Sequence, residues 1–123
     1  MSKTVLVVDD QFGIRALLRR VFESEGYTVL EAANGNETLR LLNNQTIDLV
    51  MLDLKIPGMN GVEILREMRE GKLMTDVLMM TAYGEHELIQ EAMALGARTY
   101  LAKPFDINDV REQVRELFGK HPQ

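Results

Sequence analysis

The order of apolar and polar residues along the chain alternates between two kinds of segment. Three short runs are continuously apolar: residues 5–8, 49–52 and 77–80. Runs of this length without polar interruption are typical of strands that are covered on both faces, as in the centre of a parallel sheet. Residues 28–32 and 98–102 are more mixed, which fits strands at the edges of such a sheet.

Between these runs lie five segments in which apolar residues recur every three or four positions, the spacing of a helix with one buried face. They cover residues 12–25, 37–44, 62–70, 87–95 and 107–118. Residue types that favour helix ends flank them. Glycines that suit a left-handed helix end and residues that suit a helix start are Gly26, Gly96, Asn34, Asn60 and Asp106.

Strands and helices that alternate in this way predict an α/β fold. Connections between parallel strands are right-handed, so five such units favour a doubly wound, five-stranded parallel sheet in the order 2-1-3-4-5, flanked by five helices. This order puts the two mixed strands at the edges. With 123 residues, 46% of them hydrophobic, residues 1–123 are expected to form a single domain with its own core.

Composition narrows the classes of function. The chain has no cysteine, which excludes disulfides and thiolate metal sites. A net charge of −5 gives no basic surface of the kind that nucleic acid binding needs. No apolar run approaches the ~18 residues of a membrane span, and the N-terminus lacks a signal-peptide core. We therefore expect a cytoplasmic monomer that acts through contact with other proteins.

Side chains that could bind a metal ion or take part in a reaction stand at the ends of four predicted strands. Asp9 and Asp10 follow the first strand, and the third, fourth and fifth strands end at Asp53, Thr81 and Lys103. The carboxyl ends of parallel strands share one rim, so these residues should converge near the point where the winding direction reverses. Three neighbouring carboxylates resist ionising together unless a cation joins them, and Mg²⁺ prefers such oxygen ligands.

These residue types fit the transfer of a phosphoryl group to a carboxylate. Asp10 and Asp53 suit direct binding of Mg²⁺, and Asp9 could act through a water molecule. An Asp53 oxygen could then attack a phosphoryl group while Mg²⁺ and Lys103 offset the charge on its equatorial oxygens. Thr81 could hydrogen-bond the product.

Each of these residues also has a simpler interpretation. The two aspartates after the first strand could cap the following helix. The remaining three could be a loop acid, a turn hydroxyl and an ordinary ion-pair partner. Taken singly, the simpler interpretations are favoured. Jointly they leave unexplained why four strands end in a charge-complementary set, so we favour a built site.

Two prolines mark turns near this rim. Residues 56–59, Ile-Pro-Gly-Met, fit a type II turn, in which proline fixes the second position and Gly58 takes a positive φ at the third. The turn is equally consistent with a plain connection. The Lys103–Pro104 bond is a candidate for a cis peptide.

Five short motifs combine into a recognisable pattern: Val8-Asp9-Asp10, Leu52-Asp53, Ile-Pro-Gly-Met-Asn-Gly at 56–61, Met80-Thr81-Ala82 and Ala102-Lys103-Pro104-Phe105. Together they resemble the receiver domain of two-component response regulators over essentially the whole chain. Within that family, residues 9–15, 81–85 and 103–107 are most similar to a single-domain member of a sporulation phosphorelay.

The resemblance implies roles for individual residues. Asp53 would be the phosphorylated residue, and Asp10, Asp53 and the backbone carbonyl of Lys55 would bind Mg²⁺. Thr81 and Lys103 would contact the phosphoryl group. The implied partners are a sensor histidine kinase that donates phosphate and a downstream histidine-containing phosphotransferase that accepts it. A phosphatase is a further expected partner.

One tyrosine and two histidines outside the acidic set are also considered as residues that report or carry phosphate. Many members of the family place a switching aromatic residue on the last strand, where this chain has Tyr100, and switching and edge-strand packing are equally consistent. The two histidines, His86 at a helix start and His121 in the tail, are expected to be surface residues rather than phosphate carriers.

The first helix predicts a docking surface. Its apolar residues span an arc of roughly 140°, wider than the ~100° that a core stripe needs. We therefore expect an apolar collar around the rim that a partner's helices cover during transfer. With its polar neighbours it comprises Gln11, Phe12, Gly13, Ile14, Leu17, Tyr83, Pro104 and Phe105. An ordinary wide core stripe is the alternative.

Three rival functions fit less well. A flavodoxin-like electron carrier shares the topology, but Asp9 and Asp10 would repel the flavin's phosphate. An aspartyl phosphohydrolase would also use Asp53 and Mg²⁺, yet the chain lacks that class's second acid two residues later and its cap insertion. An interaction module with a vestigial site would not need the complete set of acids, hydroxyl and lysine.

Overall fold

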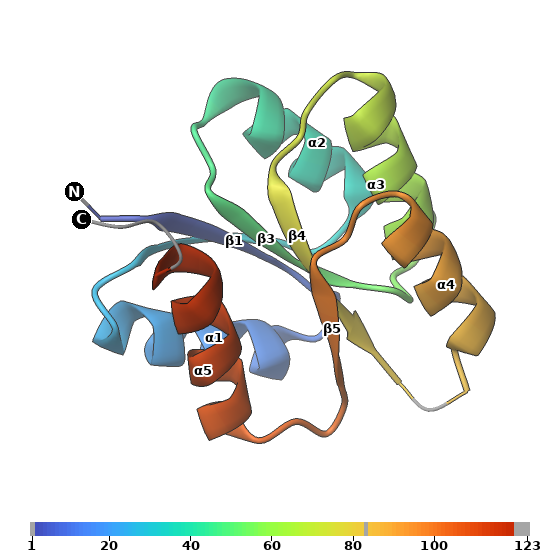
Figure 1. Ribbon diagram of the computed structural model, residues 1–123. Helices are drawn as coiled ribbons and strands as arrows, with labels where there is room; N and C mark the ends of the chain where they lie inside the picture. The colour runs from blue at the N-terminus through green and yellow to red at the C-terminus, as the bar shows by residue number, and fades with distance from the viewer. Residues whose placement is uncertain (1, 83, 120–123) are drawn as a thin grey trace.

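The computed structural model describes residues 2–82 and 84–119. Strands and helices alternate along this part of the chain (Figure 1). The strands are β1 (Thr4–Val8), β2 (Thr28–Ala32), β3 (Leu49–Asp53), β4 (Asp76–Thr81) and β5 (Thr99–Ala102). The helices are α1 (Phe12–Ser24), α2 (Gly35–Asn44), α3 (Gly61–Glu70), α4 (His86–Ala94) and α5 (Ile107–Gly119). Within the described residues, no helix has the length and apolar character needed to cross a bilayer.

The five strands form one parallel sheet in the order β2-β1-β3-β4-β5, which confirms the predicted doubly wound topology. The two mixed strands lie at the edges as predicted, and the three apolar ones lie between them. In Figure 1, α1 and α5 cover one face of the sheet, and α2, α3 and α4 cover the other. Every predicted element is present, and no boundary moves by more than two residues.

The three central strands are apolar throughout because both of their faces are covered. Successive side chains of a strand point to opposite faces, and in β1 Val5 and Val7 pack on the α1 and α5 side. Leu6 and Val8 pack on the other side, with α2, α3 and α4. All four are fully buried. Two separate cores therefore hold the sheet, while Asp9, just after β1, and Asp53, the last residue of β3, lie at its rim.

Local signals at the helix ends act as predicted. Gly26 and Gly96 take φ values of +89° and +91°, a conformation that side chains with a Cβ rarely adopt. Asn34 and Asn60 cap α2 and α3, and the Asn60 cap is reciprocal because Glu63 bonds back to the Asn60 backbone. These bonds satisfy amide groups that a helix start otherwise leaves free.

At the amino ends of β4 and β5, the side chain of Arg69 forms hydrogen bonds with the loops that lead into both strands. Its guanidinium donates to the carbonyl oxygens of Leu73 and Thr75, which precede β4, at 2.8 and 3.1 Å. It also donates to those of Leu95 and Gly96, before β5, at 2.8 and 3.4 Å. A single side chain of α3 therefore holds the amino ends of two neighbouring strands in place.

Candidate functional site

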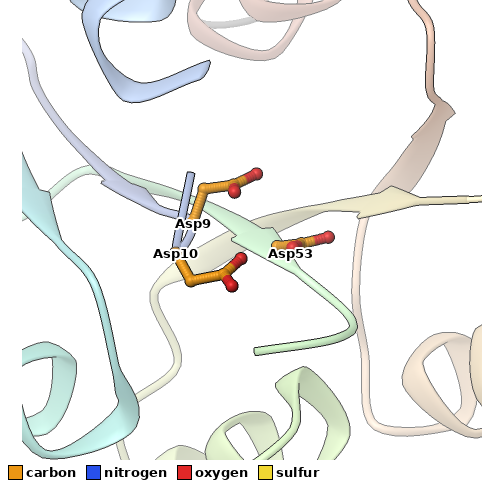
Figure 2. Close-up of side chains that lie close together, drawn as sticks. All are labelled: Asp9, Asp10 and Asp53. Atoms are coloured by element: carbon orange, nitrogen blue, oxygen red, sulfur yellow. The ribbon is translucent and has the colours of Figure 1, made fainter. Parts of the chain in front are cut away.

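Three aspartate side chains gather at the carboxyl ends of β1 and β3 (Figure 2). In the register of these two strands Val8 lies opposite Leu52, so the residues that follow, Asp9 and Asp53, come side by side. Each of Asp9, Asp10 and Asp53 offers a carboxylate oxygen, and these oxygens lie within 4.8 Å of one another. Asp9 and Asp53 are buried, whereas Asp10 is exposed.

Lys103, just after β5, places its ammonium among these carboxylates. Its Nζ lies 2.6 Å from Asp9 Oδ2 and 3.4 Å from Asp53 Oδ1. The Lys103–Pro104 bond is cis, as the sequence suggested. Burial acts against the charged form of Lys103, but the hydrogen bond to Asp9 and the nearby charges leave the pKa of Lys103 raised. The ammonium is therefore held charged between the two buried acids.

The helix-capping interpretation of the first two aspartates is not what the structure contains. The N-cap residue of α1 is Gln11, just before Phe12, and its side chain makes no capping bond. Asp9 accepts a hydrogen bond from the Gln11 backbone N–H at 2.9 Å through Oδ1, while Oδ2 accepts from Lys103. The two bonds fix the orientation of the Asp9 carboxylate within the acidic cluster.

Burial raises the pKa of Asp53 from 3.8 to about 6. The negative charge of Asp9 acts in the same direction, and Lys103 opposes it. Carboxylates that share a site resist ionising together until more positive charge arrives. The donor set of three hard oxygen ligands at the rim is the set that Mg²⁺ favours, so the residues present fit that ion.

Two glycines shape the loop after β3. Gly58 takes a φ of +86°, as the predicted type II turn requires. A Cβ on Gly61 would lie 2.5 Å from the backbone oxygen of Asp53, so only glycine allows this approach. The Gly61 N–H also donates to the Leu54 carbonyl at 2.8 Å. The start of α3 is thereby pressed against the backbone that carries Asp53.

Thr81 lies at the rim, but its hydroxyl is already within hydrogen-bond distance of a fourth acid outside the aspartate cluster. The hydroxyl lies 3.0 Å from Oε1 of Glu85, a buried carboxylate at the start of α4. The second Glu85 oxygen lies 3.9 Å from Nζ of Lys55, whose side chain is 70% exposed. Sequence reasoning did not single out Glu85, because an acid before a helix normally indicates a solvated residue; only its burial sets it apart.

Comparison with known proteins identifies the family. Residues 5–115 match the response regulator receiver domain family. The chain belongs to this family. The shared region includes the acidic cluster, Thr81 and Lys103.

Two relatives differ in how much of their own length the receiver domain covers. The receiver domain is 50% identical to sporulation initiation phosphotransferase F of Bacillus subtilis over 116 residues, which cover 94% of each chain. It is 37% identical to the alkaline phosphatase synthesis transcriptional regulatory protein of the same organism, over 98% of this chain but 50% of that protein. The receiver domain thus spans about half the length of the transcriptional regulator.

Solved structures share the fold closely. A receiver domain protein from Methanospirillum hungatei matches with a TM-score of 0.92 and 30% identity, over 98% of this chain and 96% of that one. A Thermotoga maritima response regulator, solved in complex with Mg²⁺ and BeF, matches with a TM-score of 0.83 and 36% identity, over 94% of this chain and 98% of that one.

The predicted collar of the receiver domain is partly exposed. Phe12 and Leu17 are 74% and 41% exposed, and the exposure of Leu17 supports the view that the apolar arc of α1 is wider than the core needs. Ile14 and Phe105 are half-buried and pack against the core, while Gln11, Gly13 and Pro104 are exposed. Tyr83, also predicted for this surface, lies outside the described residues.

Other predicted surface residues are also located. Tyr100 is 48% exposed on the edge strand β5, and it lines a cleft of about 620 Å³ together with Thr81 and Glu85. His86 is an exposed first residue of α4, as expected. The prediction for His121 falls outside the described residues.

The pKa of Asp53 gives a testable pH dependence. Mg²⁺ requires an ionised carboxylate, and in the metal-free receiver domain Asp53 takes up a proton as the pH falls through about 6. Protons and metal then compete, so the apparent Mg²⁺ affinity is expected to weaken up to ~10-fold for each pH unit below this value. Calorimetric titration with Mg²⁺ across this range measures the effect. An affinity with the same pH dependence in Asp53→Asn would contradict the assignment to Asp53.

Proposed function

We propose that this receiver domain accepts a phosphoryl group from a kinase's phosphohistidine onto Asp53 and passes it to a histidine of a second protein. The observation that carries the proposal is the meeting of Asp9, Asp10 and Asp53 within 4.8 Å with the Lys103 ammonium between two of them. Such a set has a nucleophile, a place for a divalent cation and a fixed positive charge.

The residues divide the first transfer between them. An Asp53 oxygen attacks phosphorus, the P–N bond of the phosphohistidine breaks, and its electron pair leaves with the donor's imidazole. Asp9 and Asp10, with Asp53 and the backbone carbonyl of Lys55, would hold Mg²⁺. When bound, the ion offsets negative charge on the transferred oxygens.

Lys103 and Thr81 act on the phosphoryl group itself. The Lys103 ammonium, already 3.4 Å from Asp53 Oδ1, can contact an oxygen of the group without a large rearrangement. The Thr81 hydroxyl can donate a hydrogen bond to another oxygen once it turns toward Asp53. Lys103 is in place before the reaction, and a donor of this kind stabilises developing charge at little further cost.

The product is an acyl phosphate, which can pass its phosphoryl group on. In the second step the bond between Asp53 and phosphorus breaks, a P–N bond to an acceptor histidine forms, and the Asp53 carboxylate is restored. The likeness to a sporulation phosphotransferase over 94% of both chains supports this relay role. The proposed partners are a sensor histidine kinase, a histidine-containing phosphotransferase and a phosphatase.

Acetyl phosphate tests the first half of the proposal, because it supplies a phosphoryl group without a partner protein. We expect intact-mass measurement to show one added phosphoryl group with Mg²⁺ and none with EDTA. Uptake that is unchanged in EDTA would contradict the metal-assisted mechanism. To test the relay, the phosphorylated receiver domain is mixed with a histidine-containing phosphotransferase. The phosphoryl group should move to that protein, and the mass of the receiver domain should return to that of the unmodified form.

The collar around the rim is proposed as the docking surface for these partners. Leu17→Ala removes an exposed apolar side chain from α1 and leaves the buried residues of that helix in place. Folding stability should therefore change little, while the rate of transfer from a phosphorylated partner should fall by roughly tenfold, as for the loss of a moderate interface contact. Stopped transfer reactions with labelled partner measure this rate.

Met74 offers a matched control for the docking experiment. It is an exposed apolar residue, 73% accessible, and it precedes β4, at the end of the sheet away from the rim. Met74→Ala should transfer phosphate at the rate of the unchanged protein. A normally folded Leu17→Ala variant that does the same would contradict the proposed surface.

A further inference from the structure

Glu85 is a buried acid that the chemistry above does not use. Its side chain is only 6% exposed. It stands at the N-cap position of α4, where a side chain usually accepts from the first amides of its own helix. Glu85 makes no such bond. Its carboxylate turns back toward the end of β4 instead.

The contacts of the Glu85 carboxylate are with groups beside the phosphoacceptor site. Oε1 accepts a hydrogen bond from the Ala82 backbone N–H at 2.7 Å and lies 3.0 Å from the Thr81 hydroxyl. Oε2 lies 3.9 Å from the ammonium of Lys55. Burying a carboxylate is costly unless such donors satisfy it, so this arrangement depends on Thr81 and Ala82 facing Glu85.

The position of Thr81 makes this arrangement relevant to phosphoryl transfer. In the sheet, Met80 lies opposite Asp53, so Thr81 is the next residue of the adjoining strand. On its other side the Thr81 carbonyl accepts from the Lys103 N–H at 2.7 Å. Thr81 therefore lies between the strand that carries Asp53 and the residue that supplies the ammonium.

A hydroxyl has one hydrogen to donate. The Thr81 hydroxyl lies at 3.0 Å from both the Ala82 carbonyl and Glu85 Oε1, and a charged acceptor forms the stronger bond. While Thr81 donates to Glu85, it cannot donate to an oxygen of a phosphoryl group attached to Asp53. The carboxylate and a phosphoryl group thus compete for the same hydroxyl.

We propose that Glu85 is a positioning residue for phosphoryl transfer, which holds the Thr81 hydroxyl and the Ala82 amide in an arrangement that a phosphoryl group on Asp53 must displace. This inference rests on the proposed function, since it requires a phosphoryl group at Asp53. In this view, the bonds of Glu85 to Thr81 and Ala82 oppose the arrangement that a phosphorylated Asp53 needs, and their strength sets how readily that arrangement forms. A ligand that binds one of two arrangements has an apparent affinity reduced by the fraction of molecules in that arrangement.

The probe for this inference is beryllofluoride with Mg²⁺, which mimics a phosphoryl group on a carboxylate and needs no partner protein. Glu85→Ala removes the competing acceptor. We expect it to bind beryllofluoride about tenfold more tightly than the unchanged protein, because a hydrogen bond to a charged group is worth roughly that factor. In the amide NMR spectrum of the free variant, the Ala82 signal should already lie near its position in the beryllofluoride complex.

Two further variants separate positioning from charge and from helix effects. Glu85→Asp keeps the negative charge but draws the oxygens back by one methylene, so it should also bind beryllofluoride more tightly. Glu87→Ala removes an exposed acid from the first turn of the same helix and should leave the affinity unchanged. Melting temperatures without ligand show whether each variant is folded.

The outcomes distinguish this inference from the proposed function. Failure of the unchanged protein to bind beryllofluoride or take up phosphate would contradict the proposed function. Binding by the unchanged protein, together with equal or weaker binding by a folded Glu85→Ala variant, would overturn only the role of Glu85. A gain in Glu85→Ala that is absent from folded Glu85→Asp would also overturn it, since charge alone would then explain the result.

Discussion

Replacement of Asp53 by asparagine is expected to abolish phosphoryl uptake from acetyl phosphate while leaving the fold intact. An amide is far less nucleophilic than a carboxylate, and the aspartyl oxygen that would form the acyl phosphate is gone. The carboxylates of Asp9 and Asp10 remain, but the proposal assigns them to metal binding. Intact-mass measurement should therefore detect no added phosphoryl group at any time point.

The same variant should be more stable than the unchanged protein when Mg²⁺ is absent. The pKa of Asp53 is raised from 3.8 to about 6 in the folded state, so ionisation of this group costs stability as the pH rises between these values. Asparagine has no proton to lose and stays uncharged, so the difference in unfolding free energy between the two proteins should disappear below pH 3.8. Urea titrations in EDTA at several pH values measure it.

A matched control for Asp53→Asn is Asp109→Asn, on the exposed first turn of α5. It makes the same chemical change away from the acidic cluster and should take up phosphate normally. Stable phosphate on the Asp53→Asn variant, in a form that resists the loss expected of an acyl phosphate, would place the acceptor on another residue and contradict the assignment.

Replacement of Lys103 by methionine should lower the free energy of unfolding in the absence of metal and strengthen the binding of Mg²⁺. Methionine keeps most of the side chain's bulk but removes the cation from Asp9, which is completely buried, and from Asp53. Breaking a buried ion pair costs about 3 kcal/mol or more, so the free energy of unfolding in EDTA should fall by roughly that amount. Mg²⁺ should restore much of it and bind more tightly, because Lys103 no longer competes for the same oxygens.

Phosphoryl transfer should remain slow in Lys103→Met even at saturating Mg²⁺. A positioned donor to the transferred group is lost, and such losses reduce rates by roughly a hundredfold or more. Urea denaturation with and without Mg²⁺, together with the rate of uptake from acetyl phosphate, tests both parts. Weaker Mg²⁺ binding in the variant would contradict the view that Lys103 and the metal share the acidic cluster.

The sequence predicts the fold well because each element has an independent signal. The central strands are read from their lack of alternation, which follows from cover on both faces. Gly26 and Asn60 mark helix ends by their backbone preferences, and the structure uses both as predicted. Helix starts were less well placed, as at α2, which begins at Gly35 rather than 37, because first turns carry few apolar contacts.

The acidic cluster is also predictable, since topology alone brings the ends of β1, β3 and β5 to one rim. The partners of Thr81 are not. Nothing in the pattern around Glu85 distinguishes a solvated helix-start acid from one turned back into the protein, because that depends on side-chain orientation after folding. The exposure of Leu17 was only partly predictable. The wide apolar arc of α1 indicates that some of its residues remain exposed, but only the packing of the folded protein decides which ones.

Arg69 has a consequence for how the molecule can respond to phosphorylation. Its bonds to four backbone carbonyls anchor the chain where it enters β4 and β5, whereas Thr81 and Lys103 lie where it leaves them. A rearrangement of Thr81 is therefore expected to be local, with little movement of the amino ends of β4 and β5. The amino ends of these two strands are thus fixed by Arg69, while the side chains that would respond to phosphorylation lie at their carboxyl ends. The hydrogen bonds at the carboxyl ends can therefore change while the rest of the protein stays in place.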